Sequence, residues 1–117
     1  YGHSSGDAVL RTVAEIIKEH LRESDIPSRY GGEEFAVLLP YTHIEEAKIV
    51  GERLRKAVEA ASIPIDKKNI NVTISMGLAE FNPEETGEEL FKRADRALYE
   101  AKESGRNKVC VDLNAKQ

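Results

Sequence analysis

The stretch that most constrains the fold is residues 29–40, which reads Arg-Tyr-Gly-Gly-Glu-Glu-Phe-Ala-Val-Leu-Leu-Pro. After the two glutamates its residues are apolar as far as Pro40, and such a run is typical of a buried strand. Two adjacent glycines, Gly31 and Gly32, stand just before the run. A glycine pair between extended segments permits positive φ at both positions of a tight turn, so the sequence predicts a β-hairpin here.

Glu33 and Glu34 follow the glycines directly. Adjacent like charges repel, so the turn gains no stability from them, but paired carboxylates suit a divalent cation. Mg²⁺ is typically held by one or two carboxylates together with the phosphates of a substrate, and a turn without side chains leaves room for those phosphates. The pattern therefore predicts a metal and phosphate site. The pentapeptide alone leaves a solvated turn open as the alternative.

The composition bounds the class of protein. A chain of 117 residues, 40% of them hydrophobic, is predicted to form one globular domain over residues 1–117. The net charge of -4 argues against general binding to nucleic acid, so a polyanionic substrate must arrive with metal or meet a local cluster of cations. The apolar runs are too short to span a bilayer. Cys110 is the only cysteine, so we expect a buried strand position for it and a cytoplasmic protein.

Hydrophobic periodicity and turn residues predict the remaining elements. In order they are a helix at 7–23 that Pro27 ends, the hairpin at 28–40, a helix with an apolar stripe at 44–61, an extended segment at 63–65, a polar turn at 66–69, a strand at 72–79, a helix that Gly105 ends, and a strand at 108–112. This order predicts an α+β sandwich, with helices packed on a mainly antiparallel sheet.

Capping boxes are predicted to begin the second and third helices, the first from Thr42 with Glu45 and the other from Thr86 with Glu89. On the strand at 72–79, Met76 is predicted to lie in the core. Three tyrosines are expected to be packing residues: Tyr30, Tyr41 and Tyr99. One acidic run is expected to be a solvated loop and helix start: Glu84, Glu85, Glu88 and Glu89.

Several ordered motifs resemble the GGDEF family, the diguanylate cyclases, with the signature here in its Glu-for-Asp form. They are Tyr-Gly-His-Ser-Ser-Gly-Asp at 1–7, Arg-Tyr before the glycines, Gly-Gly-Glu-Glu-Phe at 31–35, Val-Thr-Ile-Ser-Met-Gly at 72–77, Arg-Ala-Asp-Arg-Ala-Leu-Tyr-Glu-Ala-Lys at 93–102, and Gly-Arg-Asn at 105–107. The resemblance runs nearly end to end. It implies a ferredoxin-like, palm-type core and a reaction that condenses two GTP molecules into cyclic di-GMP and pyrophosphate.

The resemblance also implies roles for individual residues in a GTP site. Glu33 would be the catalytic base and a metal ligand, Glu34 would support the metal, and the metal would be Mg²⁺, with Mn²⁺ as a substitute. Asp7 would contact guanine, whose N1 hydrogen and exocyclic amine a carboxylate can accept together. The phosphates would meet four further residues: Gly31, Gly32, Lys102 and Arg106. Without the resemblance, Asp7 reads as a helix N-terminal acid and the two cations as a helix C-terminus that complements the dipole.

A second site implied by the resemblance binds the product and inhibits the enzyme. Arg22 and Asp25 form an Arg-x-x-Asp motif five residues before the glycine pair. An arginine can bond guanine O6 and N7 while an aspartate accepts from the other edge of the base. Arg53 would complete this site across a domain contact. The alternatives are a polar helix end for the pair and, for the whole chain, a non-catalytic domain that senses cyclic di-GMP.

Members of the family open with a helix and an inner strand that carries Asp-x-Asp-x-Phe-Lys, and then Asn-Asp before the Tyr-Gly-His motif. Because this chain begins at Tyr1, we expect an N-terminally truncated domain that is inactive alone and whose unpaired strand edges favour self-association. By the same resemblance, the catalytic species would be a homodimer. An upstream sensory or receiver domain would control it, and any membrane anchor would lie upstream. A palm domain with another base preference is a further alternative.

Overall fold

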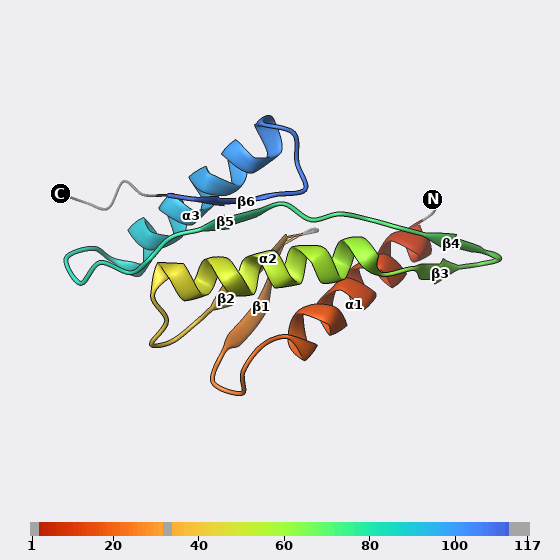
Figure 1. Cartoon of the computed structure of the whole chain (residues 1–117), viewed down its shortest axis with the longest axis horizontal. Helices are drawn as coiled ribbons and strands as arrows, with labels where there is room; N and C mark the ends of the chain where they lie inside the picture. The colour runs from red at the N-terminus through yellow and green to blue at the C-terminus, as the bar shows by residue number, and fades with distance from the viewer. Residues whose placement is uncertain (1–2, 32–33, 113–117) are drawn as a thin grey trace.

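The computed structural model describes residues 3–31 and 34–112 of the chain. Its elements are, in order, α1 (His3–Glu19), β1 (Ile26–Gly31), β2 (Glu34–Leu38), α2 (Ile44–Ala60), β3 (Ile63–Ile65), β4 (Lys68–Ile70), β5 (Met76–Leu78), α3 (Gly87–Glu103) and β6 (Val109–Val111) (Figure 1). The predicted mixture of helices and strands is therefore confirmed. Among the described residues, none of the helices combines the length and apolar character needed to cross a membrane.

The strands of the described residues form three separate pairs. β1 pairs antiparallel with β2, as the hairpin prediction required, and β3 pairs antiparallel with β4. β5 pairs with β6 in parallel, because α3 connects them and a helical crossover brings the second strand back in the same direction. No ladder within the described residues joins β2 to β5, so the predicted sheet is present as pairs. The strand expected at 72–79 is limited to β5, because only those residues meet β6.

The hydrophobic core lies between α1, α2 and one face of the hairpin. Its buried residues come from the apolar stripes of the two helices: Val13, Ile17, Leu54 and Val58. Phe35 and Val37 reach this cluster from alternate positions of β2, which is the two-residue period of a strand with one buried face. Met76 of β5 is half-buried against the same cluster, so the prediction of a core role for it is confirmed.

The β5–β6 pair lies between α2 and α3, and a glycine stands at each of the two contacts (Figure 1). A methyl group added at Gly51 of α2 would meet the side-chain methyls of Val109 at 3.5 Å, an ordinary contact. At Gly77 of β5 it would overlap backbone atoms of α3, the carbonyl oxygen of Ala94 and the nitrogen of Leu98. The backbone of α3 therefore lies directly on β5, and only glycine fits at that position.

The two predicted capping boxes have different outcomes. At α3 the box is present, since the Thr86 hydroxyl accepts from the Glu89 backbone at 3.1 Å and the Glu89 carboxylate accepts from the Thr86 backbone at 2.8 Å. At α2 the prediction is wrong. The N-cap is His43 and it makes no side-chain cap. The Ile44 backbone N–H instead donates to the Glu80 carboxylate at 2.7 Å, so a distant loop caps this helix.

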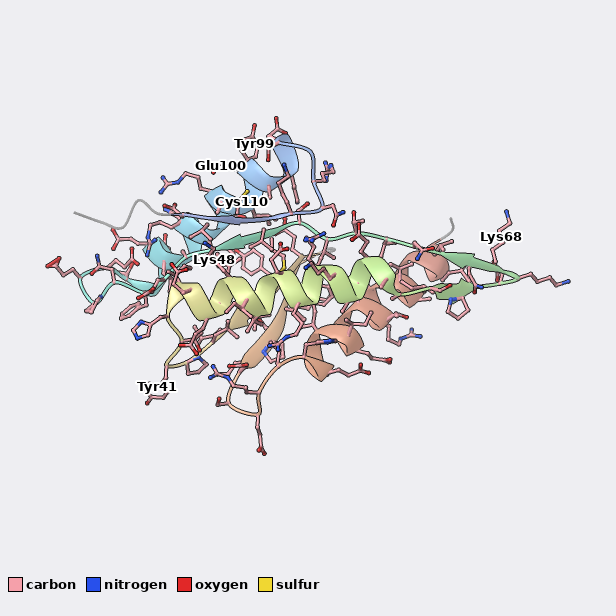
Figure 2. All side chains as sticks on the ribbon, in the orientation of Figure 1. Tyr41, Lys48, Lys68, Tyr99, Glu100 and Cys110 are labelled. Carbon is pink, nitrogen blue, oxygen red and sulfur yellow. The ribbon has the colours of Figure 1, made fainter. Side chains whose placement is uncertain are left out.

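Two of the three tyrosines predicted to pack are exposed instead. Tyr41 is in a left-handed turn, with φ of 54°, and is fully exposed, and Tyr99 of α3 is 64% exposed; both side chains extend away from the ribbon in Figure 2. Tyr30 is 61% exposed but its ring lies 4.6 Å from that of Phe91 on α3. The packing prediction therefore holds only for Tyr30, which connects the hairpin to α3. Cys110 lies in a strand, β6, as predicted, but it is half-buried and not buried.

Glu85 corrects the prediction of a solvated acidic run. Its side chain is 1% exposed and pairs with Arg93 of α3, whose Nε donates to the carboxylate at 3.0 Å. Arg93 also donates to the backbone carbonyl of Glu80. A buried carboxylate requires such a partner, because an uncompensated charge in the interior is unfavourable. Glu84 and Glu88 are exposed as predicted.

The close approach at Gly77 generates a direct test. Gly77→Ala should lower the free energy of unfolding by about 3 kcal/mol, because the added methyl meets helix backbone that cannot move aside. Gly87→Ala is the matched control, since a methyl there meets nothing within 4 Å and alanine favours the helix, so stability should be unchanged or up to about 1 kcal/mol higher. Urea denaturation measures both. Equal stabilities of the two variants would contradict the packing described.

Candidate functional site

The hairpin turn meets the C-terminal end of α3. The carboxylate of Glu34 is 40% exposed, and its Oε2 lies 3.7 Å from Nζ of Lys102, which is 35% exposed. Gly31 pairs with Glu34 across the turn, and a methyl group at Gly31 would meet nothing within 4 Å. The structure therefore brings together three of the predicted site residues and leaves open space beside the turn. Gly32 and Glu33 lie outside the described residues.

Arg106 stands just beyond the end of α3, in a loop with an unusual backbone. Gly105, Arg106 and Asn107 have φ values of 124°, 63° and 47°, three left-handed residues in succession. The Arg106 N–H donates to the Ala101 carbonyl at 2.9 Å, the bond of a Schellman helix end, so Gly105 terminates α3 as predicted. Lys102 and Arg106 thus share one helix end. Their complementation of the helix dipole and a role in phosphate binding are compatible with each other.

A cavity of about 540 Å³ lies between α1 and the hairpin. Asp7 lines it, and it is exposed. α1 begins at His3, so Asp7 is inside the helix and not in its first turn. The alternative reading of Asp7 as a helix N-terminal acid is therefore wrong.

The cavity also contains residues that the sequence prediction missed: Arg11, Lys18, Arg29 and Phe35. A signal was available for two of them, because Asp7, Arg11 and Lys18 recur at spacings of four and seven, which place them on one face of a helix. The volume is in the range of small-molecule sites. Three cations and one carboxylate around an apolar wall suit an anionic ligand with hydrogen-bond donors.

Arg22 and Asp25 form the predicted pair. Arg22 Nη2 lies 3.1 Å from Asp25 Oδ1, and the Arg22 backbone N–H donates to Oδ2 at 2.8 Å. The Asp25 side chain is 3% exposed and the Arg22 side chain 53% exposed. Both residues lie in the loop after α1, which ends at Glu19, so they are not the helix end that the alternative reading assumed.

Further contacts keep the Asp25 carboxylate ionised and hold the Arg22 guanidinium in place. Burial alone would raise the pKa of Asp25, but the hydrogen bonds from the Arg22 side chain and backbone, with its positive charge, hold that pKa below its ordinary value of 3.8. The Arg22 guanidinium also donates to the Pro40 carbonyl at 3.2 Å and to the Thr42 hydroxyl. The pair is therefore an ionised, anchored unit with the arginine facing solvent.

Arg53 is exposed on α2. Within the described part of the chain, no hydrogen bond or ion pair connects it to Arg22 or Asp25. The structure of this single chain therefore does not assemble the three predicted residues into one site. A site completed by Arg53 from another domain stays a prediction.

The two candidate sites lie at opposite ends of one hairpin (Figure 1). Glu34 begins β2 beside the turn, whereas Arg22 bonds Pro40 and Thr42 beyond the other end of β2. At about 3.3 Å per residue, β1 spans roughly 17 Å. The hairpin therefore keeps the two clusters apart and at a fixed separation.

The described residues contain no group of three or more His, Cys, Asp or Glu side chains that could hold a metal by themselves. The carboxylate of Glu34 is the described oxygen donor at the turn, and it is accessible. Mg²⁺ needs only one or two carboxylates when substrate phosphates supply further oxygens. The donor set therefore fits a cation that arrives with a phosphorylated ligand, with Lys102 beside it.

The chain is similar to known cyclases in both sequence and structure. It matches the family described as diguanylate cyclase, GGDEF domain, over residues 1–108. Diguanylate cyclase A of Treponema denticola is 50% identical over 115 residues, which are 97% of this chain and 31% of that protein. The chain therefore spans about a third of that relative.

Solved structures of diguanylate cyclases superpose closely on this chain. The diguanylate cyclase SiaD of Pseudomonas aeruginosa, crystallised with its activator SiaC, superposes with a TM-score of 0.91 at 41% identity, over 95% of this chain and 43% of SiaD. The GGDEF domain of DgcB from Caulobacter crescentus, in complex with c-di-GMP, also gives 0.91, at 35% identity, over 96% of this chain and 67% of that one. The chain therefore belongs to the GGDEF-domain family of diguanylate cyclases.

Proposed function

We propose that the protein containing this domain condenses two GTP molecules into cyclic di-GMP and pyrophosphate, and that cyclic di-GMP inhibits it at Arg22 and Asp25. The observation that carries the proposal is the 3.7 Å contact between Lys102 Nζ and Glu34 Oε2. It unites the end of α3 with the hairpin turn, two segments that are far apart in the sequence. A cation and a carboxylate side by side are what a metal-bound triphosphate requires.

The triphosphate of GTP would lie over the turn. Gly31 leaves open space there, and Lys102 and Arg106 supply positive charge from the α3 end. The carboxylates of Glu33 and Glu34 would hold Mg²⁺, which when bound neutralises phosphate charge and polarises the α-phosphate. Lys102 would then exchange its contact with Glu34 for the phosphates.

The guanine base would enter the cavity between α1 and the hairpin. Asp7 lines this cavity and is exposed, so its oxygens are available to accept from N1–H and the exocyclic amine of guanine. Adenine does not offer these two donors together. This arrangement supports GTP over ATP as the substrate, which separates the proposal from a palm domain with another base preference.

The reaction needs a base and a second nucleotide. Glu33 would take the proton from the 3′-hydroxyl of one GTP. The freed oxygen forms a bond to the α-phosphorus of the other GTP, and the bond between α-phosphorus and the bridging oxygen breaks as pyrophosphate leaves. Performed in both directions, this step closes the cyclic product. Since each domain would bind one nucleotide, a C₂ homodimer is the catalytic species that we propose.

The inhibitory site rests on the Arg22–Asp25 pair. Asp25, Pro40 and Thr42 anchor the guanidinium through Nε and Nη2 while its side chain stays 53% exposed, so Nη1 is the nitrogen that would donate to the guanine edge. The lowered pKa of Asp25 keeps its carboxylate ionised, and because that side chain is only 3% exposed, its role is to hold the arginine in place. Arg53 from a second domain would complete the site. An upstream sensory or receiver domain that sets the distance between domains is part of the same proposal.

A second candidate function is a domain that senses cyclic di-GMP without catalysis. The observation that favours it is the Arg22–Asp25 pair, which is formed within a single chain and needs neither a metal ion nor a catalytic base. Both candidates include binding of cyclic di-GMP, and they differ in turnover of GTP.

Turnover separates the two candidates. With Mg²⁺, we expect the protein that contains this domain to convert GTP and not ATP. We expect Glu33→Gln in that protein to lower the rate at least about 100-fold, because the amide neither accepts the proton nor holds the metal well. Chromatography of the product and pyrophosphate release measure this. Glu84→Gln, at an exposed loop position outside the site, is the control with unchanged rate. A fully active Glu33→Gln variant would refute the assignment of the base.

Product binding tests the inhibitory site. Calorimetric titration with cyclic di-GMP should show binding that Arg22→Ala weakens about 10- to 100-fold, the usual effect of losing an arginine contact to guanine. Arg22→Lys should also bind weakly, because an ammonium lacks the fork geometry. Lys68→Ala, which removes an exposed cation from β4, should leave the affinity unchanged. Unaltered binding by Arg22→Ala would place the product elsewhere.

A further inference from the structure

The loop after α3 has a backbone that its residues do not favour by themselves. Glycine adopts positive φ freely, but Arg106 carries a Cβ atom that crowds the following carbonyl in the left-handed region. Asn107, also left-handed, belongs to the residue type that tolerates this region best after glycine. A left-handed backbone at a residue other than glycine persists only when neighbouring contacts hold it. The hydrogen bonds of Asn107 are such contacts.

The side chain of Asn107 is fixed from both ends by α2. Its Oδ1 accepts a hydrogen bond from Arg55 Nη1 at 3.0 Å, and its Nδ2 donates to Glu59 Oε2 at 2.7 Å. Its backbone N–H donates to the Ser75 hydroxyl, just before β5, at 3.1 Å. Asparagine tolerates this backbone, and its short side chain supplies both a donor and an acceptor.

Arg55 is itself held in place. Its side chain is 15% exposed, and it bonds both oxygens of Glu52, one turn earlier on α2, at 3.0 and 3.1 Å. The hydrogen bond to Glu52, with the charges of Glu52 and Glu59, raises the pKa of Arg55 above its ordinary value, so it remains a cation. Glu59 Oε1 also lies 3.5 Å from Arg55 Nη1. The helix therefore presents Arg55 to Asn107 as a donor held by Glu52, and Glu59 as an acceptor.

The helix end and the next strand do not need these contacts. The Arg106 N–H already satisfies the Ala101 carbonyl, and β6 is held by its ladder with β5. What the bonds to Asn107 add is a fixed backbone next to the preceding residue, and the side chain of that residue starts from this backbone. That residue is Arg106.

We propose that Asn107, Arg55 and Glu59 are positioning residues that aim Arg106 at the terminal phosphates of GTP. The inference rests on the proposed function, in which Arg106 binds those phosphates. In this inference, α2 fixes the loop relative to the hairpin turn. The helix contributes nothing else to the triphosphate site. The part of the nucleotide that Arg106 would bind is its pyrophosphate group.

The test compares two nucleotides that differ in that part. α,β-Methylene-GTP keeps all three phosphates but cannot release pyrophosphate, whereas GMP has no terminal phosphates. The measurement is calorimetry with Mg²⁺ in the protein that contains this domain. Asn107→Gly should weaken the binding of α,β-methylene-GTP about tenfold and leave the binding of GMP unchanged. Glycine is chosen because it keeps the positive φ while removing the side chain.

Further variants test the mechanism. Arg106→Ala should reproduce the loss, and the double variant Asn107→Gly with Arg106→Ala should lose no more than Arg106→Ala alone, because Asn107 acts through Arg106. Arg55→Lys keeps the charge but not the two-point bond to Glu52, so its affinity should fall between those of the wild type and Asn107→Gly. Lys56→Ala, an exposed neighbour on α2, is the control with wild-type binding.

The outcomes separate the inference from the proposed function. Wild-type affinity in Asn107→Gly beside a weakened Arg106→Ala would overturn the inference and leave the proposed function intact. Equal weakening of both nucleotides, or additive losses in the double variant, would also overturn it, since both indicate general destabilisation. A wild-type protein that does not prefer α,β-methylene-GTP to GMP, or an Arg106→Ala variant with unchanged affinity, would overturn the phosphate site itself.

Discussion

The contact on which the rest of the structure depends is the approach of the α3 backbone to β5 at Gly77. No side chain separates helix and strand there, so the position of α3 is set by main-chain contact. From that position Lys102 reaches Glu34, Phe91 lies beside Tyr30, and the loop with Arg106 begins next to β5. If α3 lay farther from β5, all three of these contacts would be lost. The glycine of the Ser-Met-Gly motif is thus a structural condition for the candidate site.

The hairpin has the complementary role of holding two chemically different clusters at its two ends. The turn combines a carboxylate, a cation and open backbone, which suit phosphates and Mg²⁺. The far end combines an ionised Asp25 and an anchored Arg22, which suit the edge of a guanine base. Because a paired strand is stiff, the two clusters keep their separation, and a ligand at one end does not occupy the other.

The sequence predicted features whose cause is local and missed those whose partners are distant. The hairpin, the Thr86 box and the helix end at Gly105 follow from neighbouring residues. The Glu80 cap of α2 comes from 36 residues away, and Asn107 meets Arg55 across 52. The sequence predicts a solvated Glu85, because nothing in its acidic run indicates Arg93, eight residues on, as a buried partner. Such pairs form only when the helices pack, and the hydrophobic periodicity of the sequence does not predict them.

The central claim is that the turn and the end of α3 form one triphosphate site, distinct from the Arg22 cluster. Paramagnetic broadening of backbone amide NMR signals by Mn²⁺ bound with α,β-methylene-GTP tests it most directly, since broadening falls steeply with distance from the ion. The account predicts selective loss of the amide signals of Glu34, Lys102 and Gly105, while those of Arg22 and Asp25 stay sharp. Broadening centred on Arg22 and Asp25, with the turn unaffected, would contradict it.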